Sequence, residues 1–456
     1  AKVSAAQRLQ SNAGLCFQGM NLVGKGFRLA PLQVQSLGYP LDALPEVIKP
    51  HRNARDMMQG GEDSWVIDFF GFTAEQARDQ HPALYQWLLD RVKPERDHNN
   101  RESRRRNWWL FGEPVGRLRT AWKSLPRVIL TPETSKHRLF EFQPLPFCPD
   151  HKLYAICSAD AFVLGVLSCG VHARWALRAG GRLGFGNDPT WTNTTCFLPF
   201  VFPDASPEKR ARIAALAEQI DTHRKRQQSA HPDLTLTGIY NVLEKLRRNE
   251  PLNAKEKVIH DHGLVSVLRE LHDELDHAVF AAYGWNDLAA VLVGKPGATT
   301  PYPEKSAEQA AAEEELLSRL VALNAERAAE EARGLIRWLR PEFQAATPQP
   351  AEQTEIDVET RADTAAQGEA GNAGGTHGAG PAMPKRAPWP ATLPEQIRVV
   401  AETITAAPGP LDLEQLAAHF TGRGPWKKRL PDIVDSLAAL GRVKAERVGE
   451  RLVWRG

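Results

Sequence analysis

A segment that cannot form a hydrophobic core divides this chain into two parts that can. Residues 345–390 consist mainly of Ala, Gly, Pro, Gln, Thr and Glu, and the run GEAGNAGGTHGAGPAMPKRAP (368–388) has almost no large apolar side chain. Such a composition cannot bury enough surface to offset the entropy of ordering, so we expect a disordered linker over 345–390. A large N-terminal part and a small C-terminal module of 391–456 remain.

The N-terminal part changes character near residue 204. Before this point, short apolar runs such as SWVIDFFGF (64–72) are separated by Pro, Gly and Asn clusters, which predicts short strands and long loops. From 205 to 344, apolar residues recur at helical spacing, as in ARIAALAEQI (211–220), and a long helix is expected over 307–340. The predicted fold class is α+β, with a mixed, short-stranded domain over 1–204 and a helical domain over 205–344.

The C-terminal module has the pattern of a winged helix. Three helices are expected near 394–406, 411–420 and 426–440, and RVKAERVGERLVWRG (442–456) predicts a β-hairpin. A recognition helix presents cations to a DNA groove at its start, although winged helices that bind protein leave that alternative open. The cations at the start of the third expected helix are Arg423, Lys427, Lys428 and Arg429.

The net charge of +2 hides an uneven distribution of charge. Residues 91–140 contain 13 Lys or Arg against 5 Asp or Glu, whereas residues 301–380 contain 7 against 15. Any contact with nucleic acid is therefore expected to be local. The chain has no apolar run near the ~18 residues of a membrane span, and its five cysteines form no CxxC pair, which together favour a reduced, cytoplasmic protein without membrane contact.

The basic stretch has the residue types that read duplex DNA. Lys and Arg neutralise phosphates, Arg reaches the O6 and N7 atoms of guanine, and Asn pairs with adenine in the major groove. The segment RVKPERDHNNRESRRRNWW (91–109) supplies all of these. The alternative is a solvated charged surface, since charge runs are commonly exposed. We expect Trp108 and Trp109 to lie in the core rather than to stack on bases.

Several segments in one order resemble a known family. The resemblance is to the target recognition domain of MmeI-type, class I, adenine-specific DNA methyltransferases, which modify DNA in restriction or other phage-defence systems, and to the helical segment that follows that domain. It spans roughly residues 10–340. The segments that carry it are CFQGMNLVGKGFRL (16–29), VIKPHRNARDM (47–57), WVIDF (65–69), RVKPERDHNNRESRRRNWWLFGEP (91–114), RVILTPETSKHRLF (127–140), FVLGVLSCGVHARWA (162–176), CFLPFVFPD (196–204), TLTGIYNVLEKLR (235–247) and HDELDHAVFAAYGW (272–285).

The resemblance implies a division of labour within a larger enzyme. Residues 1–204 would bind double-stranded DNA, while a methyltransferase catalytic domain, N-terminal or in trans, would use S-adenosylmethionine. The family's catalytic Asn-Pro-Pro-aromatic motif is not matched by Asn187-Asp188-Pro189-Thr190, and GGRLGFG (180–186) lacks the strand–loop–helix context of a cofactor loop. We therefore expect this chain alone to bind no cofactor and to catalyse no methyl transfer, and Ala1 to lie downstream of the catalytic domain.

Charge chemistry within the resembling segments selects ten candidate DNA contacts. Phosphate contacts position a protein, and base-edge contacts specify the sequence. Asp56 and Asp68 are instead expected to cap turns or orient arginines, because carboxylates repel phosphates. The candidate contacts are Lys25, Lys49, Arg52, Lys136 and Arg138 for phosphates or bases, and Arg101, Arg104, Arg105, Arg106 and Asn107 in the region of the base-edge readers.

Two other functions stay open at this point. A DNA-binding regulator could act through the winged helix, and a metal-dependent hydrolase could use clustered ligands. Zinc accepts thiolate and imidazole ligands, and residues four apart on a helix share a face, but apolar or amphipathic helices explain both clusters as well. The candidate ligands are Cys148, His151, Cys169 and His172 in one set, and His260, His262, His272, Asp273, Asp276 and His277 in the other.

Overall fold

The computed structural model separates two compact units, Ala1–Gln367 and Gly368–Gly456. It describes residues 2–61, 63–183, 188–345, 387–390, 393–407, 410–421, 430–439, 443–448 and 451–455. The expected linker lies almost entirely outside these residues, as do the four cations of the expected recognition helix, so both remain predictions. The expected domain boundaries near residues 204, 344 and 390 also remain predictions. Among the described residues, no helix has the length and apolar character needed to cross a membrane.

Two four-stranded sheets form the frame of the larger unit. The first has the order β1-β8-β5-β6 and is antiparallel throughout; the second has the order β2-β4-β3-β7, with a parallel pair between β3 and β7. The first sheet consists of β1 (Cys16–Gln18), β8 (Leu153–Ile156), β5 (Arg127–Pro132) and β6 (Glu141–Pro144), and the second of β2 (Arg28–Leu29), β4 (Trp65–Ile67), β3 (Ile48–Arg52) and β7 (Cys148–Pro149).

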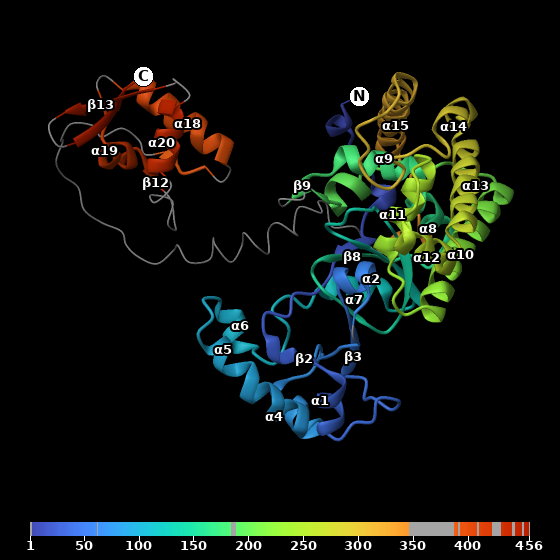
Figure 1. Ribbon diagram of the computed structural model, residues 1–456. Helices are drawn as coiled ribbons and strands as arrows, with labels where there is room; N and C mark the ends of the chain where they lie inside the picture. Colours follow the sequence, from blue (N-terminus) through green and yellow to red (C-terminus); the bar gives the residue numbers. More distant parts are fainter. Residues whose placement is uncertain are drawn as a thin grey trace. The chain divides into compact units, whose positions relative to one another are not determined.

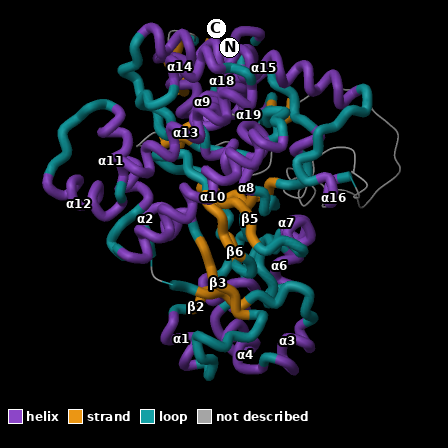
Figure 2. Tube along the Cα trace, turned by 90° about the vertical axis from the view of Figure 1, so that its right-hand side faces the viewer, coloured by secondary structure: helices purple, strands orange, loops and turns teal. Residues whose placement is uncertain are grey.

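Residues 22–113, apart from 54–59, form a distinct lower part of this unit, which we call the lobe and which contains β2, β3 and β4 of the second sheet. Figure 2 shows β3 between the first sheet above and the lobe helices below. Thr73 caps α3 by accepting from the backbone N–H of Gln76 at 3.2 Å, which fixes where that helix begins. The helices here are α1 (Pro31–Ser36), α3 (Ala74–Gln80), α4 (Pro82–Arg91), α5 (Lys93–Asp97) and α6 (Glu102–Arg106), with α2 (Ala54–Gln59) and α7 (Gly116–Trp122) beside the first sheet (Figure 1).

Helices follow the sheets in the chain and share one hydrophobic core with them. Gly165 in α8 lets α10 approach closely, because a Cβ there would lie 2.7 Å from Ile213 Cγ2. Helix α15 ends at Ala332, earlier than the expected end at 340; Gly334 adopts a φ of +91° just beyond it. The helices are α8 (Ala161–Ser168), α9 (Gly170–Ala179), α10 (Pro207–Ala230), α11 (Leu236–Arg247), α12 (Ala254–Gly263), α13 (Val265–Tyr283), α14 (Asn286–Leu292), α15 (Ala307–Ala332) and α16 (Pro341–Gln344).

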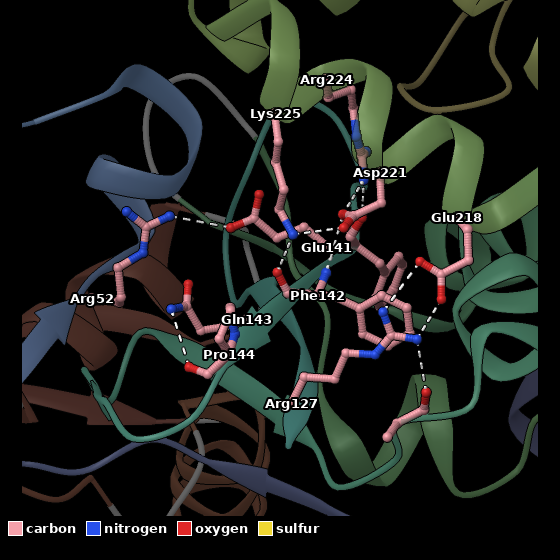
Figure 3. A network of polar contacts seen from close by, with 12 residues as sticks. Arg52, Arg127, Glu141, Phe142, Gln143, Pro144, Glu218, Asp221, Arg224 and Lys225 are labelled. Atoms are coloured by element: carbon pink, nitrogen blue, oxygen red, sulfur yellow. Dashed lines mark hydrogen bonds and ion pairs between the residues drawn. The ribbon is translucent and has the colours of Figure 1, made fainter. Parts of the chain in front are cut away.

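Side chains of α10 cover the open edge of the first sheet (Figure 3). The edge strand is β6, and the N–H of Phe142 donates to Asp221 Oδ1 at 3.2 Å. Arg224 donates to the carbonyl of Phe140 at 2.6 Å, and Lys225 donates to the carbonyl of Phe142. An uncovered edge would present these backbone groups to another strand. The side chains of α10 bind them instead, so no fifth strand is needed there.

Among its described residues, the smaller unit contains three helices followed by an antiparallel pair of strands. Its core is built around Val400, Leu416, Val434 and Trp454. This order of elements is the one expected from the sequence, and the α+β fold class of the chain is confirmed, while the assignment as a winged helix stays a prediction. The elements are α18 (Leu393–Ala406), α19 (Leu413–Ala418), α20 (Leu430–Ala439), β13 (Lys444–Val448) and β14 (Arg451–Arg455), with a short parallel pair of β11 (Ala387–Pro388) and β12 (Phe420–Thr421).

Removal of the Asp221 carboxylate should destabilise the larger unit. Asp221→Ala leaves the buried N–H of Phe142 without its acceptor and buried Arg224 without its ion-pair partner. We expect the free energy of unfolding, measured by urea denaturation, to fall by about 3 kcal/mol. Glu274→Ala removes an exposed partner of Arg212, another residue of α10, and should cost under about 1 kcal/mol. Equal decreases for the two variants would contradict the role given to Asp221.

A buried histidine in β3 should make stability depend on pH. His51 is buried, and neither ring nitrogen has a hydrogen-bond partner among the residues that the structure describes. Burial, with the nearby charge of Arg28, lowers the pKa of His51 to about 4. Since an unfolded histidine has a pKa of about 6.5, the unfolded chain binds the extra proton first, and stability is lost as the pH falls from about 6.5 toward 4.

The substitution His51→Leu should remove this contribution. It takes away a titrating group and leaves no polar partner unpaired, so we expect the difference in unfolding free energy between pH 7 and pH 5 to shrink by about 1 to 2 kcal/mol. Denaturation curves at the two pH values for both proteins measure it. A variant with the pH dependence of the parent protein would show that His51 does not titrate as described.

Candidate nucleic-acid interface

The basic stretch is built around one buried arginine. Arg96 in α5 is only 1% exposed, and its guanidinium donates to the carbonyls of Leu22 at 2.9 Å, Val23 at 2.8 Å, Leu110 at 3.0 Å and Arg104 at 3.3 Å. Burial, with the charge of Arg104, lowers its pKa to about 10. Sequence reasoning missed this role, because Arg96 lies in the same charge run as the surface arginines.

Helix α6 carries the expected base-edge readers, and the structure sorts them into two groups. Arg105, Arg106 and Asn107 are exposed. Arg106 pairs with Glu102 at 3.0 Å across the surface, an ion pair that solvent weakens. Arg104, by contrast, is 15% exposed and lies 2.8 Å from Glu113, and Arg101 lies 3.7 Å from the same carboxylate. Among the candidate base-edge readers, those that face solvent are therefore Arg105, Arg106 and Asn107.

The adjacent tryptophans belong to the core, as expected. Trp108 is buried and meets Tyr85 edge to face, with ring centroids 5.2 Å apart. Trp109 donates from its indole N–H to the carbonyl of Phe72 at 2.9 Å. Both rings thus fix α6 to the lobe and are not free to stack on bases.

Lys25 lies on the lobe, two residues after Val23, whose carbonyl binds Arg96. It is exposed in a 3-10 turn (Lys25–Phe27), next to the chain segment whose carbonyls bind Arg96. A Cβ at Gly26 would lie 2.7 Å from Arg91 Cβ, so this turn packs directly against α4. Arg91 itself is exposed, with its guanidinium 3.4 Å from the ring centroid of Trp87. The lobe therefore presents Lys25 and Arg91 in addition to α6.

Two further candidates are engaged in ion pairs where the lobe joins the first sheet. Lys49 Nζ lies 2.8 Å from Asp68, which also binds Arg119 at 2.6 Å. Burial raises the pKa of Asp68, but Arg119 and Lys49 outweigh it, so the pKa is lowered overall. This confirms the expectation that Asp68 orients an arginine. Arg52 is half-buried and lies 3.2 Å from Glu141.

The loop between β5 and β6 (133–140) contains the last two candidates, which have opposite environments. Arg138 is 3% exposed, and its guanidinium donates to Thr131 Oγ1 at 3.0 Å and to the carbonyl of Pro189 at 3.3 Å. It lies inside the protein and holds the loop, so a contact with DNA would require these bonds to break. Lys136 is exposed and donates to Asn241 Oδ1 at 2.7 Å.

Four of the candidate metal ligands are occupied by other contacts. Cys169 Sγ donates to the carbonyl of Val166, and His172 Nδ1 lies 2.9 Å from the carbonyl of Leu167. Asp276 accepts from the N–H of Gly170, and His272 Nε2 lies 2.7 Å from Tyr240 Oη. Within the described ranges, no three or more His, Cys, Asp and Glu side chains are grouped so that they could hold a metal ion.

The glycine-rich segment 180–186 leads into a hairpin. Strands β9 (Arg182–Leu183) and β10 (Asp188–Pro189) pair antiparallel, while residues 184–187 lie outside the described structure. Gly180 is required for close packing, because a Cβ there would lie 2.0 Å from the carbonyl oxygen of Thr190. The described part of this segment does not have the strand–loop–helix form of a cofactor-binding loop.

Comparisons with known proteins show a fold that has been seen before. No protein-family model matches the chain, and no curated protein matches it. A solved structure of the type IIL restriction-modification enzyme MmeI in complex with DNA matches 71% of this chain with a TM-score of 0.50 and 16% sequence identity. The matched region spans 37% of that enzyme. The chain is thus similar in fold to a portion of a restriction-modification enzyme.

Proposed function

We propose that this chain is the DNA specificity part of a site-specific adenine-N6 DNA methyltransferase in restriction-modification or another phage-defence system. The observation that carries the proposal is the lobe: Arg96 holds α6 rigidly, so that Arg105, Arg106 and Asn107 face solvent. The fold similarity to an enzyme solved in complex with DNA supports it. Arginine and asparagine are side chains that distinguish base edges in the major groove.

The exposed cations of α6 favour a nucleic-acid surface over the alternative of a solvated charged surface. Runs of charged residues at a surface are ordinarily flexible. Here the helix α6 is held in place by the buried guanidinium of Arg96 and by Trp108 and Trp109. A recognition element gains affinity when it is ordered before binding, because less conformational entropy is lost on association. In this proposal Lys25 and Arg91 contact phosphates and position the duplex, while α6 and Asn107 approach the bases.

The chemical step belongs to a catalytic domain, N-terminal or in trans, in this proposal. S-adenosylmethionine would supply the methyl group when bound to that domain. The residues of this chain would bind and orient the duplex, and the helices of 205–344 would brace the recognition domain against the catalytic one. A target adenine must leave the base stack before its amino group can react, so the duplex has to be held firmly on one side.

Charge reversal on α6 tests DNA binding. Arg105→Glu combined with Arg106→Glu spares Arg104, whose backbone carbonyl and side chain hold the lobe together. We expect duplex affinity to fall at least about tenfold, and the slope of log K against log salt to decrease by ~0.9 for each phosphate that the variant no longer neutralises. Fluorescence anisotropy with a duplex at several salt concentrations measures both quantities.

A matched variant separates this surface from a general effect of charge. Arg178→Glu combined with Arg212→Glu removes two exposed arginines that pair with Glu314 and Glu274 on the helices. It changes the net charge by the same amount and should leave DNA affinity within about twofold of the parent protein. If both double variants bind DNA as tightly as the parent, α6 is not a DNA contact.

Reconstitution tests the assignment to a methyltransferase. Incubated with duplex DNA and S-adenosylmethionine, the chain alone should transfer no methyl group. With a partner methyltransferase domain, N6-methyladenine should form in the DNA, and nucleoside mass spectrometry detects it. Methylation by the chain alone, or methylation of a different base, would contradict the proposal.

A further inference from the structure

A residue on α11 completes a polar site that begins in the loop between β5 and β6. Asn241 Oδ1 lies 2.7 Å from Lys136 Nζ and 2.9 Å from His137 Nε2. The other ring nitrogen of His137 lies 2.9 Å from Thr299 Oγ1. Residues more than 100 positions apart in the chain thus meet at one side-chain oxygen.

The chemistry of these partners fixes the orientation of the Asn241 amide. A lysine ammonium can only donate, so the atom that faces Lys136 is the amide oxygen. His137 must then donate from Nε2, and its unprotonated Nδ1 accepts a hydrogen bond from the hydroxyl of Thr299 at 2.9 Å, a shorter contact than the 3.4 Å from the same oxygen to Glu244 Oε1. His137 is buried, and burial lowers its pKa to about 4, so the ring is neutral at pH 7. The amino group of Asn241 is consequently turned away from Lys136 and His137.

The two outer members of this site retain unused donors. Lys136 is exposed and Asn241 is half-buried. Among the described residues, the Nδ2 amino group of Asn241 has no hydrogen-bond partner, and Lys136 has none apart from Asn241. The ammonium therefore keeps two protons, and the amide keeps two, on adjacent groups.

The local charge favours an anionic or acceptor-rich partner. The charged side chains that act on His137 are Lys136 and Arg248, and both are cations that lower its pKa. The nearby carboxylate of Glu244 is buried, accepts from the N–H of Gly297 at 2.9 Å and lies 3.8 Å from Arg247 Nη1, so an adjacent cation offsets its charge. A surface with adjacent donors and positive charge suits paired oxygen or nitrogen acceptors.

We propose that Lys136 and Asn241 form a donor pair that contacts DNA, with His137 as the residue that positions the amide. This inference rests on the proposed function and deepens it, because it extends the DNA-contacting surface beyond residues 1–204 onto α11. The acceptors are two phosphate oxygens or the O6 and N7 atoms of a guanine, which present the same paired acceptor chemistry.

The substitution Asn241→Asp tests the pair with little change of shape. An aspartate keeps an acceptor for Lys136 and for His137 but replaces the amino donors with a carboxylate oxygen. We expect the thermal unfolding midpoint to stay the same or rise, while duplex affinity of the full chain falls about tenfold or more. A residue with only a structural role would show the first effect without the second.

A matched control makes the same chemical change nearby. Asn249→Asp introduces a carboxylate just beyond the end of α11, at an exposed position with a φ of 56°, a conformation that Asp also tolerates. Its duplex affinity should stay within about twofold of the parent protein. If Asn241→Asp and Asn249→Asp bind DNA equally well, the donor pair does not contact DNA.

Selection from a random-sequence duplex library distinguishes the two kinds of acceptor. For a phosphate contact, Lys136→Ala weakens all sequences equally and lowers the salt slope by about one; for a guanine contact, it removes the preference at one position of the selected site. Both results support the pair, and an unchanged affinity and preference overturn it. If the parent chain binds no duplex at all, the proposed function fails together with this inference.

Discussion

The cover that α10 provides for the edge of β6 determines how the larger unit is built. A four-stranded sheet with an open edge exposes unpaired N–H and carbonyl groups, and Asp221, Arg224 and Lys225 satisfy these groups from one face of a helix. Because these side chains are spaced three and four residues apart, α10 must lie along the strand. The helical region is thereby joined to the first sheet and shares its core, and α11 is held within reach of the loop that carries Lys136.

Buried arginines also satisfy backbone carbonyls of loop segments in this unit. Arg96, Arg138 and Arg340 are all buried, and each directs its guanidinium at backbone carbonyls from separate chain segments. A guanidinium carries five donors in a fixed plane, so it can satisfy several carbonyls that no strand or helix serves. The arginines of this unit therefore include a structural set, which is buried and binds backbone carbonyls, and an exposed set, part of which lies on the lobe.

Sequence reasoning identified the features that depend on local pattern. The helices after residue 205, the core position of Trp108 and the pairing of Asp68 with an arginine followed from periodicity and from the chemistry of single residues. The role of Arg96 and the meeting of Lys136 with Asn241 did not, because contacts between distant segments leave no periodic signal. Charge counting also treated Arg138 as a surface cation like Lys136. The structure shows that Arg138 is buried and that Lys136 is exposed.

This division between buried and exposed arginines bears on how tightly the chain can hold DNA by itself. Each phosphate contact contributes through release of a counterion, so the exposed cations, rather than the total of 13 in residues 91–140, set the electrostatic part of the affinity. Arg96 and Arg138 contribute nothing to the electrostatic part of the affinity while their guanidinium groups are bound to backbone carbonyls. Under the proposed function, binding by the chain alone is therefore expected to be modest at physiological salt, and a catalytic domain on the same duplex would supply the remaining affinity. When two weakly binding surfaces contact one duplex, their binding free energies add. Binding is then tight only where both surfaces contact the DNA.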